Sequence, residues 1–156
     1  MAVIDIDGVV ADVRHRLQHV ARAPKDWDAF FAGAPDDEVL AVGVDTVRRL
    51  AEVCEIVYLS GRPEWCRRDT RDWLARHALP PGDLHLRPRN DRRPARLIKV
   101  EALDRLSERG HVTVLVETTR RCAPRRVLPG TTYSLPTGWG NAAIRMCCTR
   151  RRRSTG

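Results

Sequence analysis

The chain begins with a short apolar run that ends in two aspartates and a glycine, Ala2-Val3-Ile4-Asp5-Ile6-Asp7-Gly8. Side chains alternate between the two faces of a strand, so Asp5 and Asp7 are expected on one face at its end. Gly8 lets the chain leave the strand with a backbone conformation that other residues avoid. Buried carboxylates are costly unless they bind a cation or take part in proton chemistry. The pair is therefore a candidate site for phosphoryl transfer with Mg²⁺, and the alternative is an ordinary turn at a strand end.

Apolar strand-like segments alternate with segments of helical spacing through residues 1–117. Strands are expected at 2–6, 56–59, 84–86 and 112–116, and helices at 25–32, 39–53, 64–77 and 95–108. This alternation predicts the α/β class, with a parallel sheet covered by helices. The spacing also places Trp65, Trp73 and Leu74 on the inner side of one helix, and Asp36 or Asp37 at the start of another.

Ligands of such sheets bind beyond the carboxyl ends of the strands. Six polar residues are expected at that edge: Asp5, Asp7, Ser60, Arg62, Lys99 and Glu117. Each has an ordinary explanation when taken alone, as a turn residue, a solvated helix residue or a helix cap. Their joint placement at one edge favours a functional site.

The order Asp5-Ile6-Asp7-Gly8, Ser60, Lys99 and then an acid after the fourth strand resembles the haloacid dehalogenase superfamily of phosphotransferases. Within it, the chain is similar to the 3′-phosphatase domain of phage-type polynucleotide kinases. The matching stretches are 14–16 with 24–27 and 30–31, 60–62 with 68–74, and 87–94 running to Lys99. The resemblance covers about residues 1–117 and implies a three-layer Rossmann-like fold. The insert after Asp7 is short, so we expect a small or absent cap.

The resemblance also implies a role for each matching residue. Asp5 would be the nucleophile, and Asp7 would protonate the leaving oxygen and then activate water. Ser60 and Lys99 would bind the phosphoryl group and complete the catalytic set. The implied substrate-binding residues are Gly61, Arg62, Arg14, Arg89 and Asp91. The cofactor would be Mg²⁺, held by Asp5, Asp7 through its backbone carbonyl, and Glu117.

The implied function is a Mg²⁺-dependent phosphomonoesterase that works through an aspartyl-phosphate. Its expected partner is the 3′-phosphate of a nucleic-acid end or of a nucleotide. Two alternatives stay open: a small-molecule phosphatase of the same superfamily, and a catalytically weakened protein that binds nucleic acid. The kinase half of the bifunctional enzymes is not expected in this chain, because the sequence has no Gly-x-x-x-x-Gly-Lys-Ser/Thr loop.

The chain departs from the family pattern at two places. Ala95 stands where the phage enzymes have an aspartate, and Glu117-Thr118-Thr119 stands where the family has two or three acids. The formal net charge is +8, but residues 1–117 carry all 20 acidic residues and are nearly neutral. Residues 118–156 contain nine arginines and no acid. At a normal charged composition, this absence has a chance on the order of one in a thousand.

A one-base slip in the gene explains both the lost acids and the change in composition. Glu-Thr-Thr-Arg-Arg-Cys can be encoded GAG ACG ACC CGG CGG TGC, and one added G after GAG gives Glu-Asp-Asp-Pro-Ala-Val. We therefore expect residues 118–156 to be an out-of-frame segment, disordered or irregular, after a phosphatase domain at 1–117. The alternatives are a nucleic-acid-binding arm and a solvated tail. Sequencing the 3′ end of the gene tests this hypothesis.

The remaining features predict an ordinary cytoplasmic protein. No apolar run reaches the roughly 18 residues of a membrane span, and no signal-peptide pattern is visible at the N-terminus. The five cysteines have no CxxC pairing, so reduced thiols are expected. Neither a membrane nor a protein partner is predicted.

Overall fold

A five-stranded sheet forms the centre of the structure, a computed structural model that describes residues 1–118 and 142–145. The strands are β1 (Ala2–Ile4), β4 (Ile56–Pro63), β5 (Asp83–Arg87), β6 (Val114–Thr118) and β7 (Ala142–Arg145). Their order across the sheet is β5-β4-β1-β6-β7. The first four are parallel, and β7 pairs antiparallel with β6. The predicted α/β class with a parallel sheet is confirmed.

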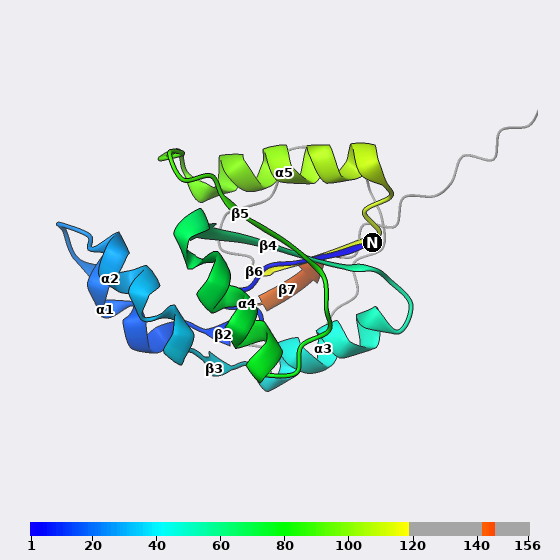
Figure 1. Ribbon diagram of the computed structural model, residues 1–156, viewed down its shortest axis with the longest axis horizontal. Helices are drawn as coiled ribbons and strands as arrows, with labels where there is room; N and C mark the ends of the chain where they lie inside the picture. The colour runs from blue at the N-terminus through cyan, green and yellow to red at the C-terminus, as the bar shows by residue number, and fades with distance from the viewer. Residues whose placement is uncertain (119–141, 146–156) are drawn as a thin grey trace, which may run out of the picture.

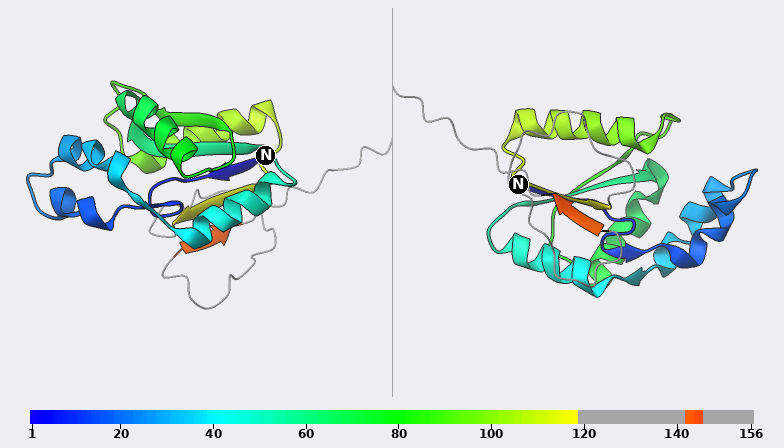
Figure 2. Two further views of the ribbon diagram at one scale, coloured as in Figure 1. Left: turned by 60° about the horizontal axis from the view of Figure 1, so that its bottom comes forward. Right: turned by 180° about the vertical axis from the view of Figure 1, so that it is seen from behind.

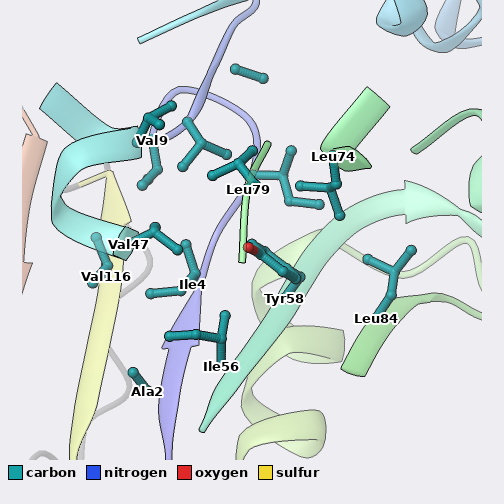
Figure 3. Close-up of a cluster of buried hydrophobic side chains, with 14 of the residues drawn as sticks. Ala2, Ile4, Val9, Val47, Ile56, Tyr58, Leu74, Leu79, Leu84 and Val116 are labelled. Atoms are coloured by element: carbon teal, nitrogen blue, oxygen red, sulfur yellow. The ribbon is translucent and has the colours of Figure 1, made fainter. Parts of the chain in front are cut away.

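Helices cover both faces of this sheet (Figures 1 and 2). Helix α5 (Ala95–Arg109) lies on one face, where Leu106 packs with Val3 and Val57. Helices α3 (Ala41–Ala51) and α4 (Arg67–Arg76) lie on the other. The larger apolar core lies between these two helices and the sheet, and Figure 3 shows its members from β1, β4, β5 and β6 around Tyr58. The predicted three layers are present.

The chain between β1 and β4 forms a small group of elements beside the sheet. It contains β2 (Ala11–Asp12), η1 (Arg14–Arg16), α1 (Gln18–Ala21), α2 (Trp27–Ala32), η2 (Ala34–Asp36) and β3 (Glu38–Val39), followed by α3. Strands β2 and β3 pair antiparallel. In Figure 1, α1 and α2 lie at the end of the molecule opposite the N-terminus, beyond the carboxyl end of β1. This matches the expectation of a small cap.

A tight turn after β1 directs the chain into this insert. The carbonyl oxygen of Ile6 accepts hydrogen bonds from the amides of three residues in turn, Val9, Val10 and Ala11. Gly8 has a φ of 79°, which residues with a side chain rarely adopt, as the sequence predicted. A Cβ on Gly43 of α3 would lie 1.8 Å from the Val9 carbonyl oxygen, so only glycine permits this helix to approach the turn so closely.

Three local predictions were wrong. The strand expected at 56–59 does not end before Ser60, because β4 continues to Pro63 with a register shift against β5. Trp65 is not on the inner side of a helix, because it lies in a separate 3₁₀ turn, η3 (Glu64–Cys66), where the α-helical phase does not apply. Asp37 does not cap α3, which has no side-chain cap, because its carboxylate binds buried cations instead.

Strand β7 is a short ordered element within the arginine-rich segment, and the sequence did not predict it. The other residues of 119–156 lie outside the described residues, and so does the prediction that they are disordered or irregular. None of the helices in the described part of the chain is long and apolar enough to cross a membrane.

Candidate active site

The carboxyl edge of the sheet opens into a cavity of about 710 Å³. Its lining comes from the segment after β1, the insert around α2, the ends of β4 and β5 with the residues that follow them, and the first turns of α5. The lining residues are Asp5, Asp7, Trp27, Asp28, Phe30, Phe31, Gly61, Pro63, Trp65, Arg87, Arg89, Asp91, Arg92, Arg93, Pro94, Ala95 and Lys99. This size is typical of small-molecule sites, and the cavity lies where ligands of α/β sheets bind.

Asp5, which follows β1, is held at this cavity by Lys99 of α5, the helix that covers one face of the sheet. The Lys99 ammonium lies 2.7 Å from one Asp5 oxygen, and the Ile6 amide donates to the other at 2.9 Å. Burial raises the pKa of Asp5, and the Lys99 charge opposes that rise. The result is an oriented carboxylate beside a positive charge, which suits a nucleophile that must receive an anionic phosphoryl group.

Asp7 is bound by two arginines and one hydroxyl. Arg62 donates from Nη2 at 2.8 Å, Arg16 donates from Nη2 at 2.6 Å, and the Ser60 hydroxyl donates at 3.1 Å. Burial alone would raise the pKa of Asp7, but Arg62 and Arg16 reverse the effect and hold this pKa below its ordinary value. Asp7 therefore stands in the site as a carboxylate.

Asp7 belongs to a buried cluster of four charged side chains. Asp37, which is fully buried, accepts hydrogen bonds from Arg16 at 2.7 Å and from Arg62 at 2.8 Å, and both arginines also bind Asp7. Each arginine side chain is only 1% exposed. Asp37 comes from the insert and Arg62 from β4, so the cluster fastens the insert to the sheet edge. We call Asp7, Arg16, Asp37 and Arg62 the buried charge cluster.

Further contacts complete the pairing of this cluster. Trp73 of α4 donates its indole N–H to the Asp37 carbonyl at 2.8 Å, and His15 Nε2 lies 2.9 Å from the Asp37 carboxylate. Thr70 lies 3.4 Å from Arg62, and the Phe30 ring faces the Arg16 guanidinium at 4.2 Å. Among the described residues, no buried side-chain nitrogen or oxygen lacks a partner. Complete pairing of this kind allows buried charges to be tolerated.

Acid is expected to weaken the fold through Asp7. Its pKa is lower in the folded chain than the ordinary value of 3.8, so its ionised form stabilises the fold above about pH 3.8. That stabilisation is lost as the pH falls through the folded-state pKa. Asp7→Asn should therefore lower the free energy of unfolding most at neutral pH, and its difference from the wild type should shrink below pH 3.8. Urea unfolding between pH 3 and pH 7 measures this, and a difference independent of pH would contradict it.

Two of the predicted magnesium ligands, Asp5 and Glu117, lie together at the carboxyl edge of the sheet. Asp5, Lys99 and Glu117 line a second cavity of about 10 Å³, the size of roughly one water molecule. The Asp7 carboxylate is occupied by the arginines and Ser60, which leaves its backbone carbonyl for a metal. Among the described side chains, no three His, Cys, Asp or Glu residues gather as a metal site. Mg²⁺ commonly binds one or two carboxylates, waters and substrate phosphate, so Asp5 and Glu117 fit it.

The loop between β5 and α5 is held by hydrogen bonds to backbone carbonyls and by ion pairs. Arg87 donates to the Gly61 carbonyl at 3.1 Å and to the Arg93 carbonyl at 3.1 Å. Arg93 binds the Asp91 carboxylate, which lowers the pKa of Asp91 to about 2, and also binds Glu101. Asp91 therefore orders this loop at the wall of the large cavity.

The predicted substrate-binding residues divide into three groups. Gly61, Arg89 and Asp91 line the large cavity. Arg62 belongs to the buried charge cluster. Arg14 is exposed, binds Asp12 and does not line the cavity. Their substrate roles stay predictions.

Several residues of the site are not evident from the sequence alone. Arg16 and Asp37 of the buried charge cluster, and Trp27, Trp65 and Arg92 of the cavity wall, were not predicted as site residues. Arg16, Trp27 and Arg92 do lie in stretches that carry the resemblance, which is the one signal that could have found them. Asp37 and Trp65 had only a helix-cap and a core-residue interpretation.

Comparison with solved structures supports the fold. Chains from two structures of the Pnkp1/Rnl/Hen1 complex, one of them described as an RNA repair complex, each match with a TM-score of 0.64 and 21% identity. The match covers 78% of this chain, which spans only 36% and 39% of the length of those chains. At this identity the likeness establishes the fold alone.

Sequence comparison assigns the family. Curated protein sequences gave no match. The family model for the LNS2 domain of PITM 1-3 matches residues 2–118, which include all the elements from β1 to β6. This matched region covers most of the chain and contains Asp5, Asp7, Ser60, Lys99 and Glu117. The chain therefore belongs to the LNS2 domain family, which has a haloacid dehalogenase-like phosphatase fold.

Proposed function

We propose that this chain is a phosphomonoesterase that removes the 3′-phosphate from a nucleic-acid end or a nucleotide through an aspartyl-phosphate on Asp5. The observation that carries the proposal is the Asp5 carboxylate at the large cavity, 2.7 Å from the Lys99 ammonium. A carboxylate beside a fixed cation at the carboxyl edge of a parallel sheet is suited to attack on a phosphate.

In the first step, an Asp5 oxygen forms a bond to phosphorus while the bond from phosphorus to the substrate oxygen breaks. Lys99 lies where it would offset the negative charge of the transferring group. In the second step, water attacks the aspartyl-phosphate, phosphate leaves, and Asp5 is restored. The two steps together consume one water and yield an alcohol and inorganic phosphate.

Asp7 is the proposed proton carrier in both steps. Its ionised state suits the second step, in which a carboxylate takes a proton from the attacking water. In the first step it must carry a proton for the leaving oxygen, although Arg62 and Arg16 favour its charged form. The proton can arrive on the phosphate monoester itself, whose second pKa is about 6.

Mg²⁺ is the proposed cofactor. Asp5, the backbone carbonyl of Asp7 and Glu117 would hold it, and when bound it would neutralise charge on the phosphoryl oxygens. Arg89 and Arg92 are exposed at the cavity wall, with no hydrogen bond or ion pair to any described residue. These two arginines could bind the neighbouring backbone phosphates of a nucleic-acid strand.

A phosphatase assay with two substrate classes tests the proposal. Phosphate release is measured from a 3′-phosphorylated oligonucleotide and from a sugar phosphate, each across a Mg²⁺ titration. We expect Mg²⁺-dependent release, with the higher kcat/KM for the oligonucleotide. Preference for the sugar phosphate would favour a small-molecule phosphatase, and no release from either substrate at any Mg²⁺ concentration would refute the proposal.

A further inference from the structure

Aromatic rings form one wall of the large cavity, and the proposed chemistry at Asp5 does not use them. Trp27 and Phe31 of α2 are stacked, with ring centroids 6.0 Å apart and an angle of 25° between the planes. Phe31 meets Trp65 of η3 edge to face at 6.5 Å. Phe31 thus joins the two tryptophans, which come from different parts of the chain, into one continuous surface beside the phosphate site.

The two tryptophans remain half exposed, although the neighbouring Phe30 is buried. Trp27 is 49% exposed and Trp65 is 47% exposed, whereas Phe30 is buried against Arg16 of the buried charge cluster. Leaving so much aromatic surface in water forgoes the stabilisation that burial would give. Rigid aromatic faces exposed in a cavity are typical of surfaces that receive a flat ligand.

The charges around this wall indicate which flat ligand fits. Lys25 lies 5.6 Å from the centre of the Trp27 ring, and Arg89 and Arg92 line the same cavity. The same lining contains Asp5, Asp7, Asp28 and Asp91, but its five cationic side chains outnumber these four acids. The site would therefore attract an anion that also carries a π-face. A nucleobase attached to phosphates has both properties, and stacking on aromatic side chains tolerates all bases.

We propose that Trp27 and Trp65 form a stacking platform for the nucleobase next to the phosphate that is removed. This inference rests on the proposed function and sharpens it: the substrate class is a base-bearing phosphomonoester. The base can belong to a free 3′-nucleotide or to the last nucleotide of a nucleic-acid strand, because a base stacks on an aromatic ring in the same way in both.

Kinetics with and without the base test the platform. One substrate is a 3′-phosphorylated oligonucleotide, and its partner has an abasic 3′-terminal residue. Trp27→Ala and Trp65→Ala should each raise KM for the base-bearing substrate by roughly 5- to 100-fold, the scale of losing one stacked base. KM for the abasic substrate should change little. Trp65→Phe, which keeps a π-face, should restore most of the affinity, and Trp65→Leu should not.

The matched control is Leu97→Ala on α5, an exposed apolar residue outside the cavity lining, which should leave both KM values unchanged. Equal loss with both substrates would overturn the platform, since it would indicate a merely structural role for the tryptophans. Comparing a free 3′-nucleotide with a 3′-phosphorylated hexanucleotide then identifies the source of the base: similar KM values indicate a nucleotide, and a lower KM for the hexanucleotide indicates a strand end.

A binding measurement separates this inference from the proposed function. A nucleoside 3′-phosphate should quench the tryptophan fluorescence of the Asp5→Asn protein, and Trp27→Ala and Trp65→Ala added to it should reduce the quenching. Base-dependent quenching in the Asp5→Asn protein, together with a wild type that releases no phosphate, would support the platform and refute the proposed reaction. Phosphatase activity in the wild type, with no base-dependent quenching in the Asp5→Asn protein, would refute the platform alone.

Discussion

Asp5→Asn is expected to slow hydrolysis of a 3′-phosphorylated oligonucleotide by roughly 10⁴-fold or more, the scale on which removal of a covalent nucleophile acts. An amide oxygen is a far weaker nucleophile than the carboxylate that Lys99 orients at 2.7 Å. Binding of the substrate should persist, because the aromatic wall and the loop arginines are unchanged. The measurement is initial phosphate release at saturating substrate, so that the loss is read in kcat.

Asp45→Asn on α3 is the matched control, since Asp45 is exposed and outside the lining of both cavities that contain Asp5. It makes the same chemical change and should leave kcat intact. Both variants should unfold near the wild-type urea concentration. Near-normal turnover by a folded Asp5→Asn protein would exclude an aspartyl-phosphate on Asp5.

Asp37→Ala is expected to lower the free energy of unfolding by about 3–5 kcal/mol, the usual cost of breaking a buried ion pair from one side. Asp37 is fully buried and holds two guanidinium groups that are themselves 1% exposed. Its loss would leave Arg16 and Arg62 to share Asp7 alone. Small domains are stable by about 5–15 kcal/mol, so this one change would remove a large part of the total. Urea unfolding followed by circular dichroism measures it.

Glu101→Ala provides the comparison for that effect. Glu101 also pairs with an arginine, Arg93, but both side chains are about half exposed, so water replaces the lost contact. The fold should be nearly as stable as the wild type. Asp37→Asn keeps the shape of the side chain and some of its hydrogen bonds. Its free energy of unfolding should lie between those of Asp37→Ala and Glu101→Ala. Equal effects of Asp37→Ala and Glu101→Ala would mean that the buried charge cluster contributes no more than a surface ion pair.

The order of helices and strands could be predicted from the sequence because it depends on local patterns. The apolar runs at β1, β4 and β6 are typical of strands buried on both faces. The helical spacing of Val44 and Val47 predicts the helix α3. The errors fall where local pattern and tertiary contact conflict. At Trp65, a 3₁₀ turn precedes α4 and breaks the helical phase, so a tryptophan expected in the core lines the cavity.

The placement of Asp5, Asp7, Ser60, Lys99 and Glu117 near one another was also predicted, since strand ends in a parallel sheet share an edge. The partners of Asp7 could not be predicted in the same way. Arg16 and Asp37 lie in the insert, and no periodic pattern records that Asp37, Arg16 and Arg62 meet. Distances of this kind depend on how the insert folds back over the sheet edge.

By itself, the sequence determined the α/β class, the strand end that carries Asp5 and Asp7, and the glycine that turns the chain there, because each is a local property of a few residues. Only the tertiary structure decided that Asp7 is held ionised by Arg16 and Arg62, and that Trp27 and Trp65 face the cavity. The physical reason is that burial and charge pairing arise between segments far apart in the chain. Their strength depends on contact distance and on the exclusion of water, which only the assembled fold defines.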